Sequence, residues 1–372
     1  MTSSSADDAA NTTATDTSGI ISLGESMPSS LARRRNPGGA RLAHIKTEPD
    51  GASVGKPVRN IENIVAPGSI EDIFEFREGL HESASSNVKV MKAKPKETDG
   101  PDVIVKMRSK KFAAGGERVF RQVLERMLNL DNHTNVLGLS RVIEDDKRYY
   151  LIMERCSGGE LFDFLQTETD VPESECKRIM REILQGVDHI HSKGLIHRDI
   201  KPENIMFTDA SADPVSPGHK KSIKLIDFDT CQEYEPMSPK AKHVVGTMGY
   251  IAPEALKGEY TPASDLWSVG VILYILMTGD MPFDVDSIVD DPAETTVGSS
   301  TMEQLYEALK DVHIDFECEP WPSFPQARDL CMELLAFSAD DRSPSAKHAL
   351  QHPWLREAAA AAAAASTSPE KL

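Results

Sequence analysis

The chain has 372 residues, of which 40% are hydrophobic and 27% charged, so it can bury one large two-lobed domain or two ordinary ones. Its net charge of −18 argues against a nucleic-acid or anionic-membrane partner and is compatible with a basic peptide partner. The cysteines are scattered and predict neither disulfides nor a zinc site, and no apolar run is long enough to span a membrane, so we expect a cytoplasmic or nuclear protein.

The two ends of the chain differ in composition from its middle. Residues 1–69 are rich in Ser, Thr, Ala, Asp, Gly and Pro without a sustained period, which predicts a disordered N-terminal tail. The arginines at 33–35 are more often solvated charge than a nuclear-import or docking cluster. Residues 357–372 are Ala-rich and predict a low-complexity C-terminal tail.

Strand patterns dominate the stretch from about residue 70 to residue 153. Apolar residues alternate over 74–80 and 88–91 around a polar turn, which predicts a hairpin. The apolar runs at 103–106 and 149–153 predict two further strands, and helical spacing predicts a helix over 117–130.

Helical patterns dominate residues 154–356. Apolar spacing predicts an amphipathic helix over 173–193, and the apolar run that follows Asp265 predicts a buried helix. A short strand is predicted at 223–226 between these two helices.

The run from His197 to Asn204 carries the clearest chemical signal. Phosphoryl transfer needs a carboxylate to orient the attacking hydroxyl, a cation for the developing charge and an oxygen ligand for Mg²⁺. Asp199, Lys201 and Asn204 can supply these groups. A His-Arg-Asp triplet alone arises by chance in charged surface loops, whereas the whole run resembles the catalytic loop of eukaryotic protein kinases.

The triplet Asp227-Phe228-Asp229 resembles the Asp-Phe-Gly motif of the same family. The resemblance implies that Asp227 binds magnesium. Asp229 replaces the glycine, which gives two interpretations: a loop acid without a role, which we favour, or a restriction on switching or an extra metal contact.

The segment 246–254 resembles the end of a kinase activation segment. The resemblance implies that Thr247 hydrogen-bonds near the catalytic aspartate and lysine, and that Glu254 pairs with Arg342. It also implies that Asp265 braces the backbone of the catalytic loop.

The predicted hairpin resembles the phosphate-covering loop of kinases without its glycines. His81, Ser83 and Ser86 stand at the glycine positions, and Val88 stands where the family places a valine over the adenine. Serine can partly replace glycine, whereas His81 cannot approach a phosphate as closely. Ile104 stands where the family usually has alanine, and its bulk would press on the adenine.

Lys106 ends the third predicted strand. A strand-end lysine is often solvated, but the resemblance implies that this one pairs with the α- and β-phosphates. We expect one acid of the helix over 117–130 to hold it. Glu125 is preferred and Glu117 is the alternative. The rival interpretation is that either glutamate is simply exposed to solvent, as most helix acids are.

The remaining nucleotide contacts are expected where the two lobes meet. The resemblance implies that Met153 lies at the back of the adenine pocket and that Glu154 and Cys156 belong to the hinge. Met206 is counted with the nucleotide-binding residues, and Glu160 would meet the ribose or a substrate arginine.

The kinase resemblance covers residues 70–356 and implies an α+β, bilobal fold. The small, mostly β lobe would span 70–153 and the larger, mostly α lobe 154–356. Three motifs resemble the calcium/calmodulin-dependent and calcium-dependent Ser/Thr group: Val244–Glu254, Tyr274–Leu276 and His352–Trp354.

The resemblance implies a kinase that uses ATP and Mg²⁺ to phosphorylate Ser and Thr hydroxyls of proteins. Glu160 and Glu203 favour substrates that are basic around the target, and an upstream kinase is hypothesised to phosphorylate Ser238, whose phosphate would pair with Arg198. The nearest rival is a pseudokinase that serves as a nucleotide-binding or scaffold module. A small-molecule kinase is disfavoured by the peptide-docking segment 246–254.

Overall fold

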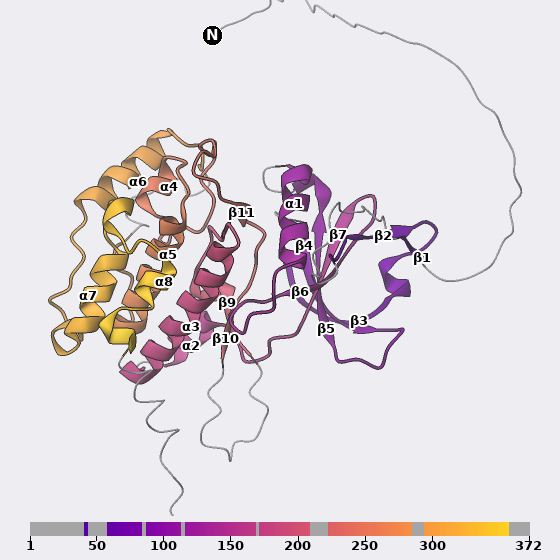
Figure 1. The fold of residues 1–372 in the computed structure, drawn as a ribbon, viewed down its shortest axis with the longest axis horizontal. Coiled ribbons are helices and arrows are strands. Elements are labelled where there is room, and N and C mark those ends of the chain that lie inside the picture. Colours follow the sequence, from indigo (N-terminus) through magenta and orange to yellow (C-terminus); the bar gives the residue numbers. More distant parts are fainter. Residues whose placement is uncertain are drawn as a thin grey trace, which may run out of the picture. The chain divides into compact units, whose positions relative to one another are not determined.

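A mainly β small lobe is followed along the chain by a mainly helical large lobe (Figure 1). The computed structural model describes residues 41–43, 58–83, 87–112, 116–168, 171–208, 222–284 and 294–356. All of these ranges belong to one unit, Gly39–Leu372. The predicted α+β, bilobal fold is confirmed.

A seven-stranded sheet in the order β1-β2-β6-β7-β5-β4-β3 forms the small lobe. Its pairs are antiparallel except for β2 and β6, which are parallel. The strands are β1 (Arg41–Ala43), β2 (Glu62–Val65), β3 (Phe74–Ser83), β4 (Val88–Pro95), β5 (Val103–Ser109), β6 (Leu139–Glu144) and β7 (Arg148–Met153).

Helix α1 (Glu117–Leu128) covers the small lobe on the side of β6. Its sequence places apolar residues three and four apart, so one face can be buried while the other meets solvent. The buried residues of this helix pack with Val142 and Leu151 of the sheet; they are Phe120, Val123, Leu124, Met127 and Leu128.

Strand β2 lies within the stretch that we predicted as tail, so regular structure begins before Ile70. Glu62 forms an ion pair with Arg141 of β6 at 2.7 Å, and Ile61 is 4% exposed against the apolar face of α1. Residues 62–65 form a strand because they pair with the free edge of β6. The periodicity of a single sequence cannot detect a partner so distant in the chain. Most of residues 1–57 and all of 357–372 lie outside the described residues.

The large lobe is built from helices and short strands. Its helices are α2 (Leu161–Thr167), α3 (Glu173–Ser192), α4 (Pro253–Leu256), α5 (Pro262–Thr278), α6 (Ser300–Asp311), α7 (Pro325–Leu334) and α8 (Ala346–Ala349). Its strands are β8 (Leu195–Ile196), β9 (Ile205–Phe207), β10 (Ile223–Leu225) and β11 (Gln232–Glu233). Short 3₁₀ helices cover Ile70–Asp72, Lys110–Phe112, Pro202–Asn204, Trp321–Ser323 and Ala339–Asp341 across both lobes.

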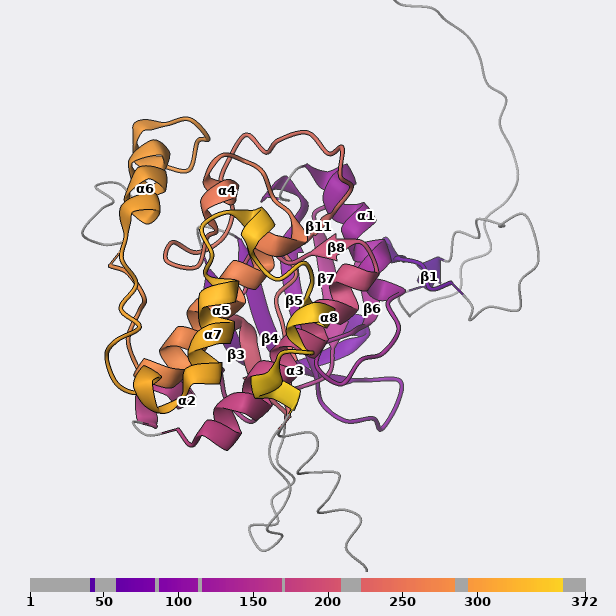
Figure 2. The ribbon, with the colours of Figure 1, turned by 60° about the vertical axis from the view of Figure 1, so that its left-hand side comes forward.

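Helix α5 forms the centre of the large lobe and contacts both α3 and α7 (Figures 1 and 2). It is apolar around most of its circumference, as expected for a helix buried on all sides. The Thr261 side chain accepts a hydrogen bond from Ala263 N at its start, and Gly279 ends it with a φ of 82°. Among the described residues, no helix is both long and apolar enough to cross a membrane.

Candidate active site

The loop between β8 and β9 is fixed by one buried carboxylate of α5. Asp265, which is 1% exposed, accepts the backbone N–H groups of His197 and Arg198 at 2.8 Å each, and His191 Nε2 of α3 lies 2.8 Å from it. Burial alone would raise the pKa of Asp265, but its contacts with His191 and His197 hold that pKa below its ordinary value. The loop is therefore positioned by the core of the large lobe.

The side chains of Asp199, Lys201, Asn204 and Thr247 meet in one cluster. Thr247 Oγ1 donates to Asp199 Oδ1 at 2.7 Å and accepts from Lys201 Nζ at 2.7 Å. Asn204 Nδ2 donates to the backbone oxygen of Asp199 at 2.8 Å and to its Oδ2 at 3.0 Å. The carboxylate of Asp199 is thus held on both oxygens, beside the ammonium of Lys201 at 3.6 Å.

The β9–β10 hairpin brings the two metal-ligand candidates together. Ile205 pairs with Leu225, so the residue before β9 and the residues after β10 lie at the same end of the hairpin. Ile226 N donates to Asn204 O at 2.9 Å, which places Asp227 next in the chain. Asp227 has a φ of 58°, a left-handed conformation that aspartate tolerates better than most residues.

The donor set at this end of the hairpin fits Mg²⁺. The ion prefers oxygen ligands, with one or two carboxylates and substrate phosphates, and Asp227 offers a carboxylate that is 39% exposed. Because Asn204 Nδ2 donates its hydrogen bonds to Asp199, the amide oxygen of Asn204 points away from that residue. Both residues line the same cavity between the lobes.

Lys106 of β5 reaches this cavity from the small lobe and contacts two carboxylates. Its Nζ lies 2.6 Å from Asp227 Oδ1 and 3.0 Å from Asp229 Oδ2. Burial disfavours the charged amine, but the carboxylates of Asp229 and Asp227 hold the pKa of Lys106 above its ordinary value. Partial burial would raise the pKa of Asp227, whereas Lys106 holds it below its ordinary value.

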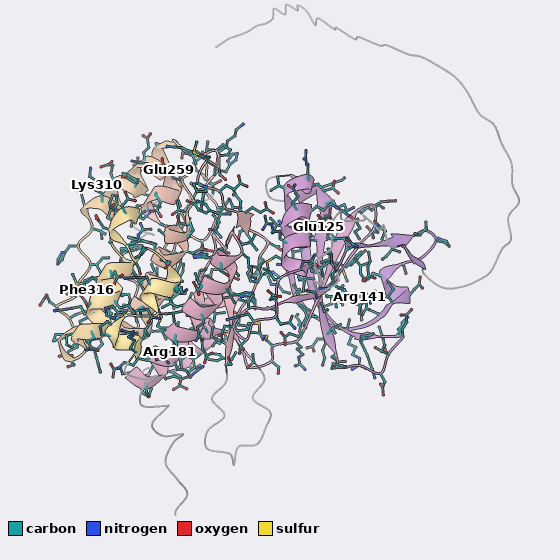
Figure 3. The ribbon with its side chains drawn as sticks, in the orientation of Figure 1. Glu125, Arg141, Arg181, Glu259, Lys310 and Phe316 are labelled. Carbon is teal, nitrogen blue, oxygen red and sulfur yellow. The ribbon has the colours of Figure 1, made fainter. Side chains whose placement is uncertain are left out.

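The acids of α1 do not hold Lys106, contrary to our preference for Glu125. Glu125 is exposed on α1 (Figure 3) and pairs with Arg121 at 3.2 Å. Glu117 Oε1 accepts from the Tyr149 hydroxyl at 3.2 Å and lies 3.6 Å from Lys110 Nζ. The inward face of the helix is apolar, so both acids point elsewhere.

A cavity of about 400 Å³ between the lobes joins these side chains. Most of the predicted nucleotide residues line it, together with Lys201 and the two metal-ligand candidates. Burial raises the pKa of the Cys156 thiol to about 11, so this lining residue stays protonated at neutral pH. The predicted nucleotide residues that line the cavity are His81, Ile104, Lys106, Met153, Glu154, Cys156, Glu160 and Met206.

Comparison with known proteins decides the family of this site. Residues 85–355 match the protein kinase domain. The chain belongs to the protein kinase family.

The curated relatives of this kinase domain include calcium-dependent protein kinases of plants. Calcium-dependent protein kinase 7 of Oryza sativa subsp. japonica is 35% identical over 238 residues, and Calcium-dependent protein kinase 17 of Arabidopsis thaliana is 37% identical over 238 residues. Both alignments cover 64% of this chain, and they cover 40% and 41% of the relatives, so the chain spans about two fifths of their length. The predicted likeness to the calcium-dependent group is confirmed.

The roof of the kinase cavity differs from our prediction in one residue. Val90, which pairs with Lys106 across the sheet, lines the cavity, whereas Val88 pairs with Arg108 and does not. Irregularities in the pairing of β3 with β4 shift the register of the two strands. Val88 and Val90 point to the same face of the sheet, so the alternation of apolar residues cannot tell which of them lines the cavity. The Ser83 side chain and Ser86 lie outside the described residues.

Sequence reasoning also missed the apolar walls of the cavity. Leu124 and Met127 of α1 line it from the side, and Phe228 lines it as well. The ring centroids of Phe228 and His197 lie 4.9 Å apart. His197 is itself fully buried, with Nε2 3.0 Å from Ile226 O. The helical periodicity of α1 marked Leu124 and Met127 as core, and only the placement of the lobes shows that they face a cavity.

The end of the activation segment is fastened to the large lobe by a buried ion pair. Arg342 donates from Nη1 and Nη2 to the two oxygens of Glu254 at 2.7 Å each, as the resemblance implied. The side chain of Arg342 is 0% exposed, and Ser264 Oγ adds a bond to Glu254 at 2.8 Å. A bidentate pair with these partners fixes the segment that carries Thr247.

Arg198 is engaged within the large lobe. Its Nε donates to Thr230 O and its Nη1 to Gln232 Oε1, both at 2.6 Å, and its guanidinium faces the Tyr260 ring at 5.2 Å. Ser238 is exposed, and its Oγ accepts from Glu235 N at 3.3 Å.

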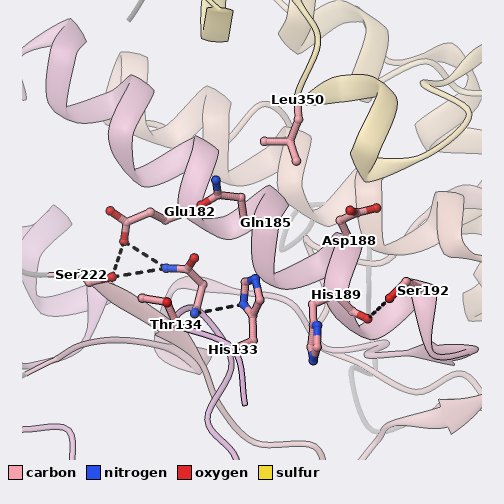
Figure 4. Close-up of a pocket in the computed structure, with 10 residues that line it drawn as sticks. His133, Thr134, Glu182, Gln185, Asp188, His189, Ser192, Ser222 and Leu350 are labelled. Atoms are coloured by element: carbon pink, nitrogen blue, oxygen red, sulfur yellow. Dashed lines mark hydrogen bonds between the residues drawn. The ribbon is translucent and has the colours of Figure 1, made fainter. Parts of the chain in front are cut away.

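A second cavity, of about 480 Å³, is lined by polar residues of α3 and of the loop before β6 (Figure 4). Glu182 accepts from Ser222 Oγ at 2.9 Å and from Ile223 N at 2.8 Å, and Asn135 Nδ2 donates to Ile223 O at 3.0 Å. These bonds tie β10 to α3. The cavity wall therefore has a structural role in positioning the strand that leads to Asp227.

Proposed function

We propose that the chain is an ATP- and Mg²⁺-dependent protein kinase that transfers the γ-phosphate of ATP to Ser and Thr hydroxyls of protein substrates. The observation that carries this proposal is the cluster around Asp199, whose two carboxylate oxygens accept from Thr247 Oγ1 at 2.7 Å and Asn204 Nδ2 at 3.0 Å. A carboxylate held in this way keeps one orientation, and its remaining lone pairs can accept the proton of a substrate hydroxyl.

Cations of both lobes complete the proposed machinery. Lys201 lies 3.6 Å from Asp199, so it would meet the negative charge that develops on the transferred phosphoryl group. Lys106 would align the nucleotide from the small lobe. Asn204 and Asp227 would hold Mg²⁺, which neutralises charge on the phosphates when bound.

Acidic side chains near the catalytic loop support a preference for basic protein substrates. Glu160 and Glu203 both line the cavity. Burial and the neighbouring carboxylates of Asp163 and Glu203 raise the pKa of Glu160, so a substrate arginine would relieve an existing repulsion. Peptides that differ only by Arg→Gln upstream of the target serine test this: equal kcat/KM for the two would contradict the preference.

Regulation by an upstream kinase at Ser238 is a separate proposal. Its support is the exposure of Ser238 in the activation segment and the presence of Arg198 beside the catalytic aspartate. Incubation with an activating kinase should raise the activity of wild type but not of Ser238→Ala. Equal activity of the two phosphorylated proteins would remove this proposal.

A pseudokinase is the second candidate, and two residues of the cavity favour it. His81 and Ile104 line the cavity from β3 and β5, where their bulk reduces the space for a nucleotide. Against this, Asp199, Lys201, Asn204 and Thr247 keep a mutual geometry that binding alone does not require.

Labelled ATP with Mg²⁺ and a basic protein substrate separates the two candidates. Wild type should incorporate label, Asp199→Asn should not, and the exposed carboxylate Asp311 of α6 offers a matched control in Asp311→Asn. Equal incorporation by wild type and Asp199→Asn would contradict the kinase proposal. If neither incorporates label, a rise in unfolding temperature with Mg-ATP would identify a nucleotide-binding pseudokinase, since a ligand at 100 times its Kd stabilises by about 2.7 kcal/mol.

A further inference from the structure

Asp229 takes part in an ion-pair cluster that joins both lobes. Its Oδ2 lies 3.0 Å from Lys106 Nζ and also contacts Arg108 Nη1. The side chain of Asp229 is 12% exposed, whereas that of Asp227 is 39% exposed. Both carboxylates line the cavity, but they differ in environment: Asp229 is the less exposed and contacts two cations, and Asp227 is the more exposed and contacts Lys106.

Helix α1 contributes no carboxylate to this cluster. Its only acids are Glu117 and Glu125, and they pair with Lys110 and Arg121 instead. The helix contacts the cluster through an aromatic ring, because the Arg108 guanidinium lies 5.1 Å from the centroid of Phe120. The ammonium of Lys106 therefore takes its partners from the triplet 227–229.

We propose that Asp229 is the positioning residue that holds Lys106, so that Asp227 can leave Lys106 and bind the metal. This inference rests on the proposed function, because it assigns separate tasks to the two carboxylates of one nucleotide site. It replaces our preferred interpretation of Asp229 as a loop acid without a role.

Charge and competition explain why two carboxylates are needed. A divalent cation at Asp227 would draw the carboxylate oxygens away from the ammonium, now 2.6 Å distant. With Asp227 alone, Lys106 would then be a buried cation without a carboxylate partner, which is costly. Asp229 remains at 3.0 Å, and Arg108 balances its charge.

The backbone at position 229 is compatible with this task. Asp227 has a positive φ, whereas Asp229 does not, so a side chain is tolerated there without backbone strain. Asp229 N also donates to Asp227 Oδ1 at 3.2 Å, which holds the Asp227 carboxylate close to the backbone of Asp229.

The first test uses nucleotide-free protein and the reactivity of one amine. An amine-reactive acylating reagent is applied at one fixed pH, and labelling of Lys106 is measured by peptide mass spectrometry, with Lys224 as an internal reference. Removal of the charge in Asp229→Asn should speed Lys106 labelling, because loss of a neighbouring carboxylate favours the uncharged, reactive amine. Glu125→Gln should leave it unchanged, and faster labelling in Glu125→Gln but not in Asp229→Asn would overturn the proposal.

Kinetics supply the second readout. Asp229→Asn should raise KM for ATP and lower kcat, and Asp229→Glu should restore part of both because it keeps the charge. If wild type transfers no phosphate, the proposed function fails, but the labelling result still decides the role of Asp229. If Asp229→Asn does not fold, Asp229→Gly carries the same labelling test, because glycine fits any backbone conformation; labelling of Lys106 at the wild-type rate in this variant would overturn the proposal.

Discussion

The hydroxyl of Thr247 joins the carboxylate of Asp199 to the ammonium of Lys201, and its removal gives the sharpest prediction. Thr247→Ala deletes two contacts at once, the donation to Asp199 Oδ1 and the acceptance from Lys201 Nζ, both at 2.7 Å. Thr247→Ser keeps the hydroxyl and loses only a methyl group. The pair of variants therefore separates the hydrogen bonds from the volume of the side chain.

The magnitude follows from the charge and exposure of the partners. A hydrogen bond to a charged group contributes about 1.5–3 kcal/mol. The side chains of Asp199 and Lys201 are 16% and 20% exposed, so water replaces part of both lost hydrogen bonds. We therefore expect the loss of the two bonds together to cost about 1.5–3 kcal/mol, the range given for one bond. Expressed as a barrier, it lowers kcat by about 10- to 150-fold.

Steady-state phosphorylation of a basic protein, with ATP varied, measures this effect. KM for ATP should stay close to that of wild type, because Thr247 does not line the nucleotide cavity. Thr247→Ser should keep kcat within about threefold of wild type, since it retains the polar contacts. The reasoning fails if Thr247→Ala keeps full kcat, or if Thr247→Ser loses as much as Thr247→Ala.

Three further predictions concern stability. Arg342→Met leaves the charge of Glu254 buried and should lower the free energy of unfolding by about 3–5 kcal/mol; denaturant unfolding measures it, and the exposed Arg356→Met should change little. Ile61→Ala opens a cavity beside α1 and should cost about 2–5 kcal/mol in the same assay, whereas no change would mean that residues 58–65 do not pack in solution. The pKa of Asp265 is lower in the folded protein than in the unfolded one, so its contribution is present above about pH 4 and is lost as the pH falls through the folded pKa. Unfolding measured from pH 3 to pH 7 should show a flatter acid limb in Asp265→Asn, and identical slopes in the two proteins would contradict the assignment.

Residues that act within one short run were predictable from the sequence. The run 197–204 places a carboxylate, a cation and an amide within a few residues, so local chain geometry brings Asp199, Lys201 and Asn204 together once the loop is braced. Distant partners such as Glu254 and Arg342 could be inferred only from the family resemblance, because nothing in composition or periodicity links them.

The errors arose where tertiary contacts override local pattern. Periodicity identifies the inward face of α1 but not what lies opposite it. It therefore led us to expect Glu125 beside Lys106, whereas Glu125 pairs with Arg121 and Lys106 contacts Asp229. Because the pairing of β3 with β4 is irregular, the cavity is lined by Val90 and not by the predicted Val88. The edge of β6 gave structure to residues 62–65 that their own sequence does not specify.

The addition of β2 to the sheet has a consequence for solubility. A strand at the edge of a sheet exposes unpaired N–H and C=O groups, which can pair with another chain and start aggregation. Residues 62–65 cover part of that edge along β6, and Arg59 fastens the segment to Asn129 through bonds of 2.7 and 2.8 Å. A fragment that begins at residue 70 would keep every side chain of the proposed catalytic site and expose the edge of β6, so we expect it to keep the activity of the full chain but to self-associate.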